Sequence, residues 1–360
     1  MSTSPFMTPG QSRLRRERAA ERRRRRRQIG SALLAVAAIG IAIALLAGAS
    51  SKGHRRSVAH AGTAKPLAPK APPLSPAGLV LAPPALKLAG IGTPSKDPIQ
   101  LRFRHPPRAG LLFNLQTGQV LWQRNANRRV AIASLTKMMT ALLTVKGGAP
   151  NEHVLVTRAA VDSNGSKVGV LPFGKHVRLE TMLYGLMLPS GNDAAVALAQ
   201  HLAGSIKAFV ADMNSEAARL GMGCTRYSSP SGYFDQENFS CAADLAMLAR
   251  VDLDQPRIAR VVDTYSAALP FPIKGGKLYL YNNNPLLIYH YPGTTGLKTG
   301  FTIAAGRCLV ATAERGGVKL GVVVLNSSAP GTQSRQLLDR GFQNVYHLPR
   351  VTEQPMPPGA

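Results

Sequence analysis

The sequence predicts an α+β domain over residues 108–348, preceded by a basic tail, an apolar segment and a proline-rich linker. Two observations lead to this fold class. Short apolar runs bounded by turn residues, typical of strands, lie near both ends of residues 108–348, and apolar residues at helical spacing fill the middle. Because strands flank a helical block, we expect the N- and C-terminal strands to share one sheet.

The positive charge is concentrated in the first part of the chain. The 360 residues include 44 Lys and Arg against 18 Asp and Glu, and 20 of these basic residues but only 3 of the acidic ones lie in residues 1–110. Most of the charge therefore lies where no folding pattern is visible. This excludes a basic nucleic-acid-binding face on a globular domain as the explanation of the excess positive charge. No nucleic-acid partner is expected. Three cysteines in 360 residues also exclude a disulfide framework.

Residues 1–28 form a basic tail that we expect in the cytoplasm, and residues 29–49 are apolar without a charged side chain. A helix of about 20 residues at ~1.5 Å per residue measures ~30 Å, the thickness of a bilayer core. By the positive-inside rule we expect a single-pass membrane protein with its folded domain extracellular or periplasmic. Two alternatives stay open. In the first, the arginine run is an arm that binds nucleic acid. In the second, residues 1–49 are a signal peptide that is cleaved near Ala47-Gly48-Ala49, and the mature protein is secreted.

Residues 50–107 are rich in Pro, Ala, Lys and Gly and show no lasting helical or strand period. This composition predicts a disordered linker, and its positive charge suits an anionic cell-wall polymer. Residues 349–360 are expected to form a short C-terminal tail.

Within residues 108–348, four strands are expected in two hairpins. The first joins Leu111–Phe113 to Val120–Trp122, and the second joins Cys308–Ala311 to Leu320–Leu325 through a Gly-Gly turn. Helices are expected where apolar residues recur at three- and four-residue intervals, around residues 138–143, 182–187, 194–202 and 337–342.

Metal and nucleotide signatures are not evident. The eight histidines include no pair four residues apart with a Glu between them, and no cysteine pair has zinc-like spacing. Residues 169–175 nearly spell a phosphate-binding loop, but His176 stands where Ser or Thr is needed and Pro172 interrupts it, so we interpret the match as coincidence. No metal and no cofactor are expected.

The segment Ser134-Leu135-Thr136-Lys137 opens a helical pattern. Because positions three apart share a helix face, the Lys137 amine can lie beside the Ser134 hydroxyl, which supplies a nucleophile and a base. A lysine acts as a base only where burial or another cation lowers its pKa. The backbone N–H of a serine in a first helical turn is also free to stabilise an oxyanion. The alternative is an ordinary helix cap with Lys137 in solvent.

Two further triplets make the signal specific. Ser190-Gly191-Asn192 follows an apolar helix that is interrupted at Pro189, and Lys298-Thr299-Gly300 lies before a strand-like run. The three elements, in this order, resemble the signature set of the penicillin-binding proteins and serine β-lactamases. Wider stretches resemble the D-alanyl-D-alanine carboxypeptidases, the low-molecular-mass penicillin-binding proteins of serine peptidase family S11. These stretches are residues 188–195, 291–293, 295–302 and 305–309.

The resemblance covers roughly residues 105–348 and does not extend to the β-rich C-terminal domain of many relatives. It implies a penicillin-binding-protein or serine β-lactamase-like transpeptidase fold, an antiparallel sheet with a helical block. It also implies removal of the terminal D-alanine from peptidoglycan stem pentapeptides through an acyl-enzyme, with β-lactam antibiotics as covalent inhibitors.

The resemblance also implies residue roles. Ser134 would attack the scissile carbonyl, Lys137 would take its proton, and Ser190 would relay that proton to the leaving D-alanine. Asn192 and Lys298 would hold the polar network, with Lys298 keeping Lys137 partly neutral by repulsion.

For substrate binding, the resemblance assigns the Lys-Thr-Gly strand. Thr299 would meet the terminal carboxylate, Gly300 would line the site, and the backbone N–H groups of Ser134 and Phe301 would hold the oxyanion.

The sequence departs from the family at two places. Ser231 stands where many relatives carry a histidine. Residues 326–333 contain no arginine to bind the substrate carboxylate, so either Arg335 or Arg307 substitutes, or Lys298 and Thr299 act alone.

Two alternative functions stay open. A serine β-lactamase needs a deacylating carboxylate, for which Glu237 is the available residue, although its surroundings do not resemble the β-lactamase loop. A catalytically inactive penicillin-binding wall sensor would keep the pocket without turnover.

The cysteines divide into a possible pair and a single residue. Cys224 and Cys241 lie 17 residues apart around a loop-like segment, and the sequence leaves open whether they form a disulfide or stay as free thiols. Cys308 is expected to be a buried small hydrophobe, with a regulatory thiol as the alternative.

Overall fold

The computed structural model describes residues 88–91, 98–233, 237–350 and 356–357. The expected basic tail and membrane segment, residues 1–49, lie outside the described residues. Within them, no single helix is long and apolar enough to cross a membrane. Asn192–Ala203 (α5) and Ile206–Arg219 (α6) reach the required length and composition only as a pair, which is bent by 86°.

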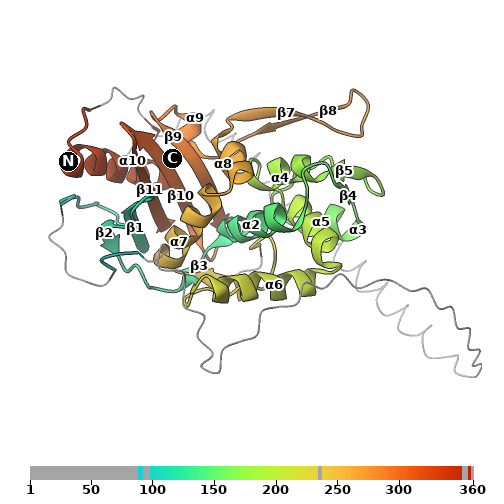
Figure 1. The fold of residues 1–360 in the computed structure, drawn as a ribbon, viewed down its shortest axis with the longest axis horizontal. Coiled ribbons are helices and arrows are strands. Elements are labelled where there is room, and N and C mark those ends of the chain that lie inside the picture. Colours follow the sequence, from blue (N-terminus) through green and yellow to red (C-terminus); the bar gives the residue numbers. More distant parts are fainter. Residues whose placement is uncertain (1–87, 92–97, 234–236, 351–355, 358–360) are drawn as a thin grey trace, which may run out of the picture. The chain divides into compact units, whose positions relative to one another are not determined.

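A five-stranded antiparallel sheet, in the order β2-β1-β11-β10-β9, forms the centre of the domain (Figure 1). Its strands are β1 (Ala109–Asn114), β2 (Val120–Arg124), β9 (Thr294–Thr302), β10 (Gly306–Arg315) and β11 (Val318–Ser327). Because β1 pairs with β11, the N- and C-terminal strands share one sheet, as predicted. The Gly316-Gly317 turn joins β10 to β11 with positive φ at both residues, which a tight two-residue hairpin requires.

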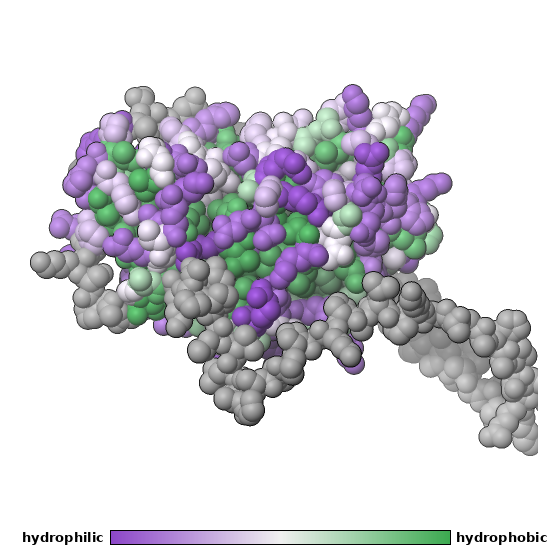
Figure 2. Space-filling view, in the orientation of Figure 1, coloured by the Kyte–Doolittle hydropathy of each residue, from purple (hydrophilic) through white to green (hydrophobic). Residues whose placement is uncertain are grey.

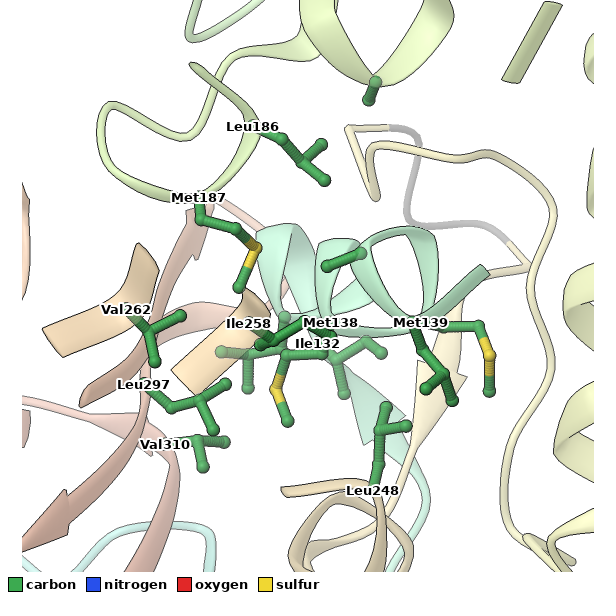
Figure 3. Close-up of a cluster of buried hydrophobic side chains, with 14 of the residues drawn as sticks. Ile132, Met138, Met139, Leu186, Met187, Leu248, Ile258, Val262, Leu297 and Val310 are labelled. Carbon is green, nitrogen blue, oxygen red and sulfur yellow. The ribbon is translucent and has the colours of Figure 1, made fainter. Parts of the chain in front are cut away.

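The helical block lies against one face of this sheet. It comprises α2 (Lys137–Gly147), α3 (Arg158–Val161), α4 (Leu179–Met187), α5, α6, α7 (Ala242–Leu253) and α8 (Pro256–Asp263). Helix α2 runs through the core, where its Met138 and Met139 lie among apolar side chains of α4, α7, α8 and the sheet (Figure 3). A core helix with strands and helices on all sides holds its N-terminal residues in fixed positions.

A smaller apolar layer covers the opposite face. The helices α9 (Pro285–Ile288) and α10 (Pro330–Arg340) and the π-helical turn Gly341–Val345 pack there, with Leu286, Leu337 and Phe342 fully buried. The predicted last helix therefore ends at Arg340, and Phe342 lies in the turn that follows.

Three two-stranded sheets complete the fold. They pair β3 (Val130–Ala131) with β6 (Phe239–Ser240), β4 (His153–Leu155) with β5 (His176–Arg178), and β7 (Ser266–Pro270) with β8 (Lys277–Tyr281). In Figure 2 the visible face is largely hydrophilic around a central apolar area.

The described part of the expected linker packs against the domain. Ala89 forms a parallel bridge with Gln119, and Ile99 is fully buried beside α10 and the sheet. The prediction of a disordered linker over residues 50–107 is thus corrected for these residues, because isolated apolar side chains among the prolines pack against the domain. The remainder of the expected linker lies outside the described residues.

The cysteines are placed as a disulfide and a buried thiol. Cys224 and Cys241 form a disulfide, with their Cα atoms 5.6 Å apart. Cys308 is 2% exposed and belongs to the apolar core, as expected of a small hydrophobe.

Candidate active site

Ser134 lies in a short 3-10 turn, Ala133–Thr136, that leads directly into α2, and Lys137 is the first residue of α2. The Lys137 amine lies 2.9 Å from the Ser134 hydroxyl. Ala133 has a φ of +49°, so the backbone is held in an uncommon conformation immediately before Ser134. The three-residue spacing thus brings the two side chains together, as predicted from the sequence.

The contacts of Lys137 orient its amine. The side chain is fully buried, and the amine donates to the Asn192 Oδ1 atom at 2.6 Å and to the Ser231 carbonyl at 2.9 Å. Both partners are acceptors only. A neutral amine has two N–H groups and one lone pair, so these two bonds leave the lone pair for the hydroxyl proton of Ser134.

The electrostatics favour a neutral Lys137. Burial is the main cause that lowers its pKa well below the usual value, the nearby Lys298 charge lowers the pKa further, and Asp193 partly opposes both. Lys298 is itself 1% exposed and donates to the Thr299 carbonyl at 3.0 Å, and burial lowers its pKa to about 7. Burial thus contributes more to the neutrality of Lys137 than the repulsion expected from Lys298.

The turn between α4 and α5 supplies a second hydroxyl and the amide. Ser190 has a φ of +66° and is 4% exposed, and its hydroxyl has no hydrogen-bond partner among the described residues. Asn192 begins α5, and its Nδ2 group donates to the Asn164 carbonyl at 2.5 Å. This bond fixes the amide so that its oxygen faces Lys137.

The Lys-Thr-Gly triplet lies inside strand β9, whereas the sequence placed it only before a strand. β9 is the edge strand of the sheet, so one side of its backbone is not paired with another strand of the described part of the chain. A Cβ atom on Gly300 would lie 3.0 Å from the Ile132 carbonyl and 3.2 Å from the Ser134 nitrogen. Only glycine therefore lets β9 approach the turn that carries Ser134 so closely.

A cavity of about 340 Å³ opens over these groups. Ser134, Ser190, Thr299, Gly300 and Phe301 line it together with Ser166, Asn283, Pro285, Arg307, Cys308, Leu309 and Pro330. The buried Lys137, Asn192 and Lys298 are not among its lining residues, although Lys137 contacts Ser134 from within the core. The cavity thus exposes Ser134, while the amines of Lys137 and Lys298 lie buried away from bulk water.

Several contributors carry no recognisable signal in the sequence. Ser166 lies on a loop that Asp193 holds by accepting hydrogen bonds from the N–H groups of Val168 and Gly169, at 2.9 and 3.0 Å. Ser231 contributes its backbone carbonyl, which every residue type possesses. Only the placement of Asp193 directly after Asn192 could have drawn attention to it.

The two departures from the family pattern have different structural consequences. At residue 231 the contact to Lys137 is made by the backbone, so it does not depend on a histidine side chain. Of the two arginines considered for carboxylate binding, Arg307 lines the cavity and Arg335 does not. Glu237, considered as a β-lactamase base, does not line the cavity. It is 61% exposed and lies 3.4 Å from Arg226.

Several known proteins are similar to this chain in sequence and fold. A family model described as D-alanyl-D-alanine carboxypeptidase matches residues 101–329. The chain is 35% identical over 253 residues to the D-alanyl-D-alanine carboxypeptidase DacF of Bacillus subtilis, an alignment that spans 68% of this chain and 64% of the relative. It is 35% identical over 245 residues to DacB2 of Mycobacterium tuberculosis, covering 66% of this chain and 82% of that protein.

The crystal structure of the Streptomyces K15 DD-transpeptidase has a similar fold. It superimposes with a TM-score of 0.63 and 31% sequence identity, over 67% of this chain and 99% of that one.

Proposed function

Because the chain belongs to the D-alanyl-D-alanine carboxypeptidase family, peptidase family S11, we propose that it is a serine-type carboxypeptidase that removes the terminal D-alanine from peptidoglycan pentapeptides. The observation that carries this proposal is the position of the Lys137 amine, 2.9 Å from the Ser134 hydroxyl and bonded to two other acceptors, so that the neutral amine turns its lone pair toward Ser134. This arrangement suits a nucleophile and its base in acyl transfer.

Acylation begins with the transfer of the Ser134 hydroxyl proton to the Lys137 lone pair. The Ser134 oxygen bonds to the carbonyl carbon between the last two D-alanines, and the N–H groups of Ser134 and Phe301 stabilise the oxyanion. The carbon–nitrogen bond then breaks, and Ser190, whose hydroxyl is free of other partners among the described residues, passes the proton to the amine of the leaving D-alanine.

Deacylation returns the enzyme to its starting state. A water molecule attacks the Ser134 ester, the shortened peptide leaves with a new carboxylate, and Ser134 regains its proton through Lys137. A β-lactam carries a reactive amide in place of the D-alanyl-D-alanine bond, so it acylates Ser134 in the same manner.

The substrate carboxylate is bound by Thr299 and Arg307. Both line the cavity, and Arg307 on β10 lies opposite Phe301 on β9 in the strand register. A guanidinium group forms charge-assisted hydrogen bonds with a carboxylate, which gives the site its preference for a free C-terminus.

We also propose that residues 29–49 anchor the protein in the membrane with the domain on the extracellular or periplasmic side. The apolar composition of residues 29–49 and the arginines before them support this orientation. The Cys224–Cys241 disulfide is consistent with an oxidising compartment.

A fluorescent penicillin and a pentapeptide test the proposed function. We expect covalent labelling of the intact protein, release of D-alanine from the pentapeptide, and loss of both in Ser134→Ala. No labelling of the intact protein would contradict the enzyme and leave a binding role. Rapid turnover of the drug would indicate a β-lactamase.

A further inference from the structure

The β7–β8 hairpin presents two exposed tyrosines side by side. Along β8 the side chains alternate, with Leu278 and Leu280 buried on one face and Tyr279 and Tyr281 on the other, where they are 63% and 62% exposed. In Figure 1 this hairpin lies beside α8 and α4 and extends from the rest of the domain. Exposed aromatic side chains that lie next to one another form a contiguous apolar patch, and such patches mark interaction sites.

The residues opposite these tyrosines leave the rings uncovered. In the hairpin register Tyr279 lies opposite Ala268, and Tyr281 lies opposite Ser266. Neither small side chain can cover an aromatic ring. Two residues along a strand are separated by ~7 Å, so the rings form a short row with open faces.

The same strand leads directly into the catalytic cavity. Asn283, two residues after Tyr281, lines the cavity, and its N–H donates to the Leu188 carbonyl in the segment that carries Ser190. At about 3.5 Å per residue, at most ~14 Å of chain separates Tyr279 from Asn283. An extended pentapeptide measures ~17 Å by the same rule. The tyrosine row therefore lies within the span of a stem peptide whose D-alanyl end occupies the cavity.

Building on the proposed function, we propose that Tyr279 and Tyr281 form a stacking platform for the amino-sugar rings of the glycan strand that carries the stem peptide. A pyranose ring presents an apolar C–H face to an aromatic ring, and the tyrosine hydroxyls remain available to the sugar hydroxyl and amide groups. The alternative partner is a membrane surface, for which exposed tyrosines beside Lys277 are also suitable. The link of β8 to the cavity favours the glycan, because the bound peptide and its glycan are one molecule.

Binding to insoluble peptidoglycan, measured by pelleting in a Ser134→Ala background, tests the platform without catalysis. We expect the double variant Tyr279→Ala/Tyr281→Ala to bind at least about fivefold more weakly than its parent. The matched variant Tyr279→Phe/Tyr281→Phe keeps the rings and should retain most of the binding. When Ser134 is kept, the Tyr279→Ala/Tyr281→Ala variant should hydrolyse a short soluble acyl-D-alanyl-D-alanine peptide at the same rate as the unaltered protein.

The outcomes separate this proposal from the proposed function. Equal peptidoglycan binding by the alanine variant and its parent would overturn the platform. In a parallel assay with anionic lipid vesicles, a loss of binding to the vesicles but not to peptidoglycan would also overturn it, and would indicate a membrane surface as the partner. A loss of binding with an unchanged melting temperature supports the platform. If the unaltered protein fails to release D-alanine from the short peptide, the proposed function is wrong, whatever the pelleting shows.

Discussion

The amine of Lys137 and the side-chain oxygen of Asn192 lie 2.6 Å apart, and this bond connects the start of α2, directly after the turn that carries Ser134, to the start of α5. Asn192 is a neutral acceptor, so it orients the amine without adding a charge that would favour the ammonium form. The choice of an amide over a carboxylate at this position thus increases the fraction of Lys137 that is neutral, and so able to accept a proton, at neutral pH.

Replacing Asn192 with Asp should move the pH dependence of acylation. A carboxylate beside Lys137 stabilises the ammonium form and raises the lysine pKa, so the amine becomes neutral only at higher pH. We expect the acidic limb of the acylation rate with a fluorescent penicillin to shift upward by at least about one pH unit. Asn192→Ala is the control, because it removes the acceptor without adding charge and should lower the rate without this shift. An unshifted profile in Asn192→Asp would contradict the assigned role of Lys137.

Replacing Lys298 with Met should stabilise the fold while removing activity. Burial lowers the pKa of Lys298 from 10.5 to about 7, so between these values the unfolded chain binds a proton that the folded chain does not. The unaltered protein therefore gains stability as pH rises from 7 to 10.5, and the burial cost is complete below pH 7. Removing the amine eliminates this cost.

We expect the melting temperature of Lys298→Met to exceed that of the parent by at least about 3 °C at pH 6, which corresponds to ~1 kcal/mol. The difference should shrink toward pH 10.5. Penicillin labelling should fall at least about 100-fold, since the variant lacks the charge beside Lys137 and the cavity. A lower melting temperature at pH 6 would show that the hydrogen bond to Thr299 outweighs the burial cost.

Gly300→Ala should separate β9 from the turn that carries Ser134. The added methyl group would lie 3.0 Å from the Ile132 carbonyl, so strand or turn must shift. We expect penicillin acylation to fall at least about tenfold, with a loss of stability of ~1 to 3 kcal/mol. Gly223→Ala is the matched control, because no atom lies within 4 Å of its added methyl group. Full acylation by Gly300→Ala would contradict the need for this close approach.

Much of the fold follows from local patterns in the sequence. The Gly316-Gly317 turn between two apolar runs identified β10 and β11, and Pro189 marked the break between α4 and α5. Strand β9 escaped notice because its threonines and glycines lack an apolar alternation, although it is held between β10 and the turn at Ser134. Tertiary contacts, rather than local preference, determine such a strand.

The site was predictable to the extent that its groups belong to short motifs. Ser134 and Lys137 meet because three-residue spacing on a helical turn fixes their separation. The Ser231 carbonyl lies 94 residues from Lys137 along the chain, and no side-chain pattern identifies a backbone acceptor. Likewise, Arg307 and Arg335 could not be distinguished until the strand register placed one of them in the cavity.

The two arginines provide a matched pair for the carboxylate site. We expect Arg307→Ala to raise the KM for a peptide with a free C-terminal carboxylate about tenfold, equivalent to ~1.4 kcal/mol, and Arg335→Ala to leave it unchanged. A substrate whose terminal carboxylate is amidated should lose this difference, because no charge remains for the guanidinium to bind. An equal effect of Arg307→Ala on both substrates would assign Arg307 a structural role.

Removing the Cys224–Cys241 disulfide should weaken both the fold and the site. The bridge joins residues separated by 17 positions, and closure of such a loop contributes ~3 kcal/mol in the chain-entropy model. The bridged segment contains Ser231, whose carbonyl accepts a hydrogen bond from Lys137. We expect Cys224→Ser/Cys241→Ser to unfold at lower denaturant concentration and to acylate more slowly, because the segment that holds the Lys137 amine becomes less constrained. Cys308→Ser, which leaves the bridge intact, controls for loss of a thiol. Unchanged acylation in the double variant, with the expected loss of stability, would show that the Ser231 contact is held by the neighbouring strands alone.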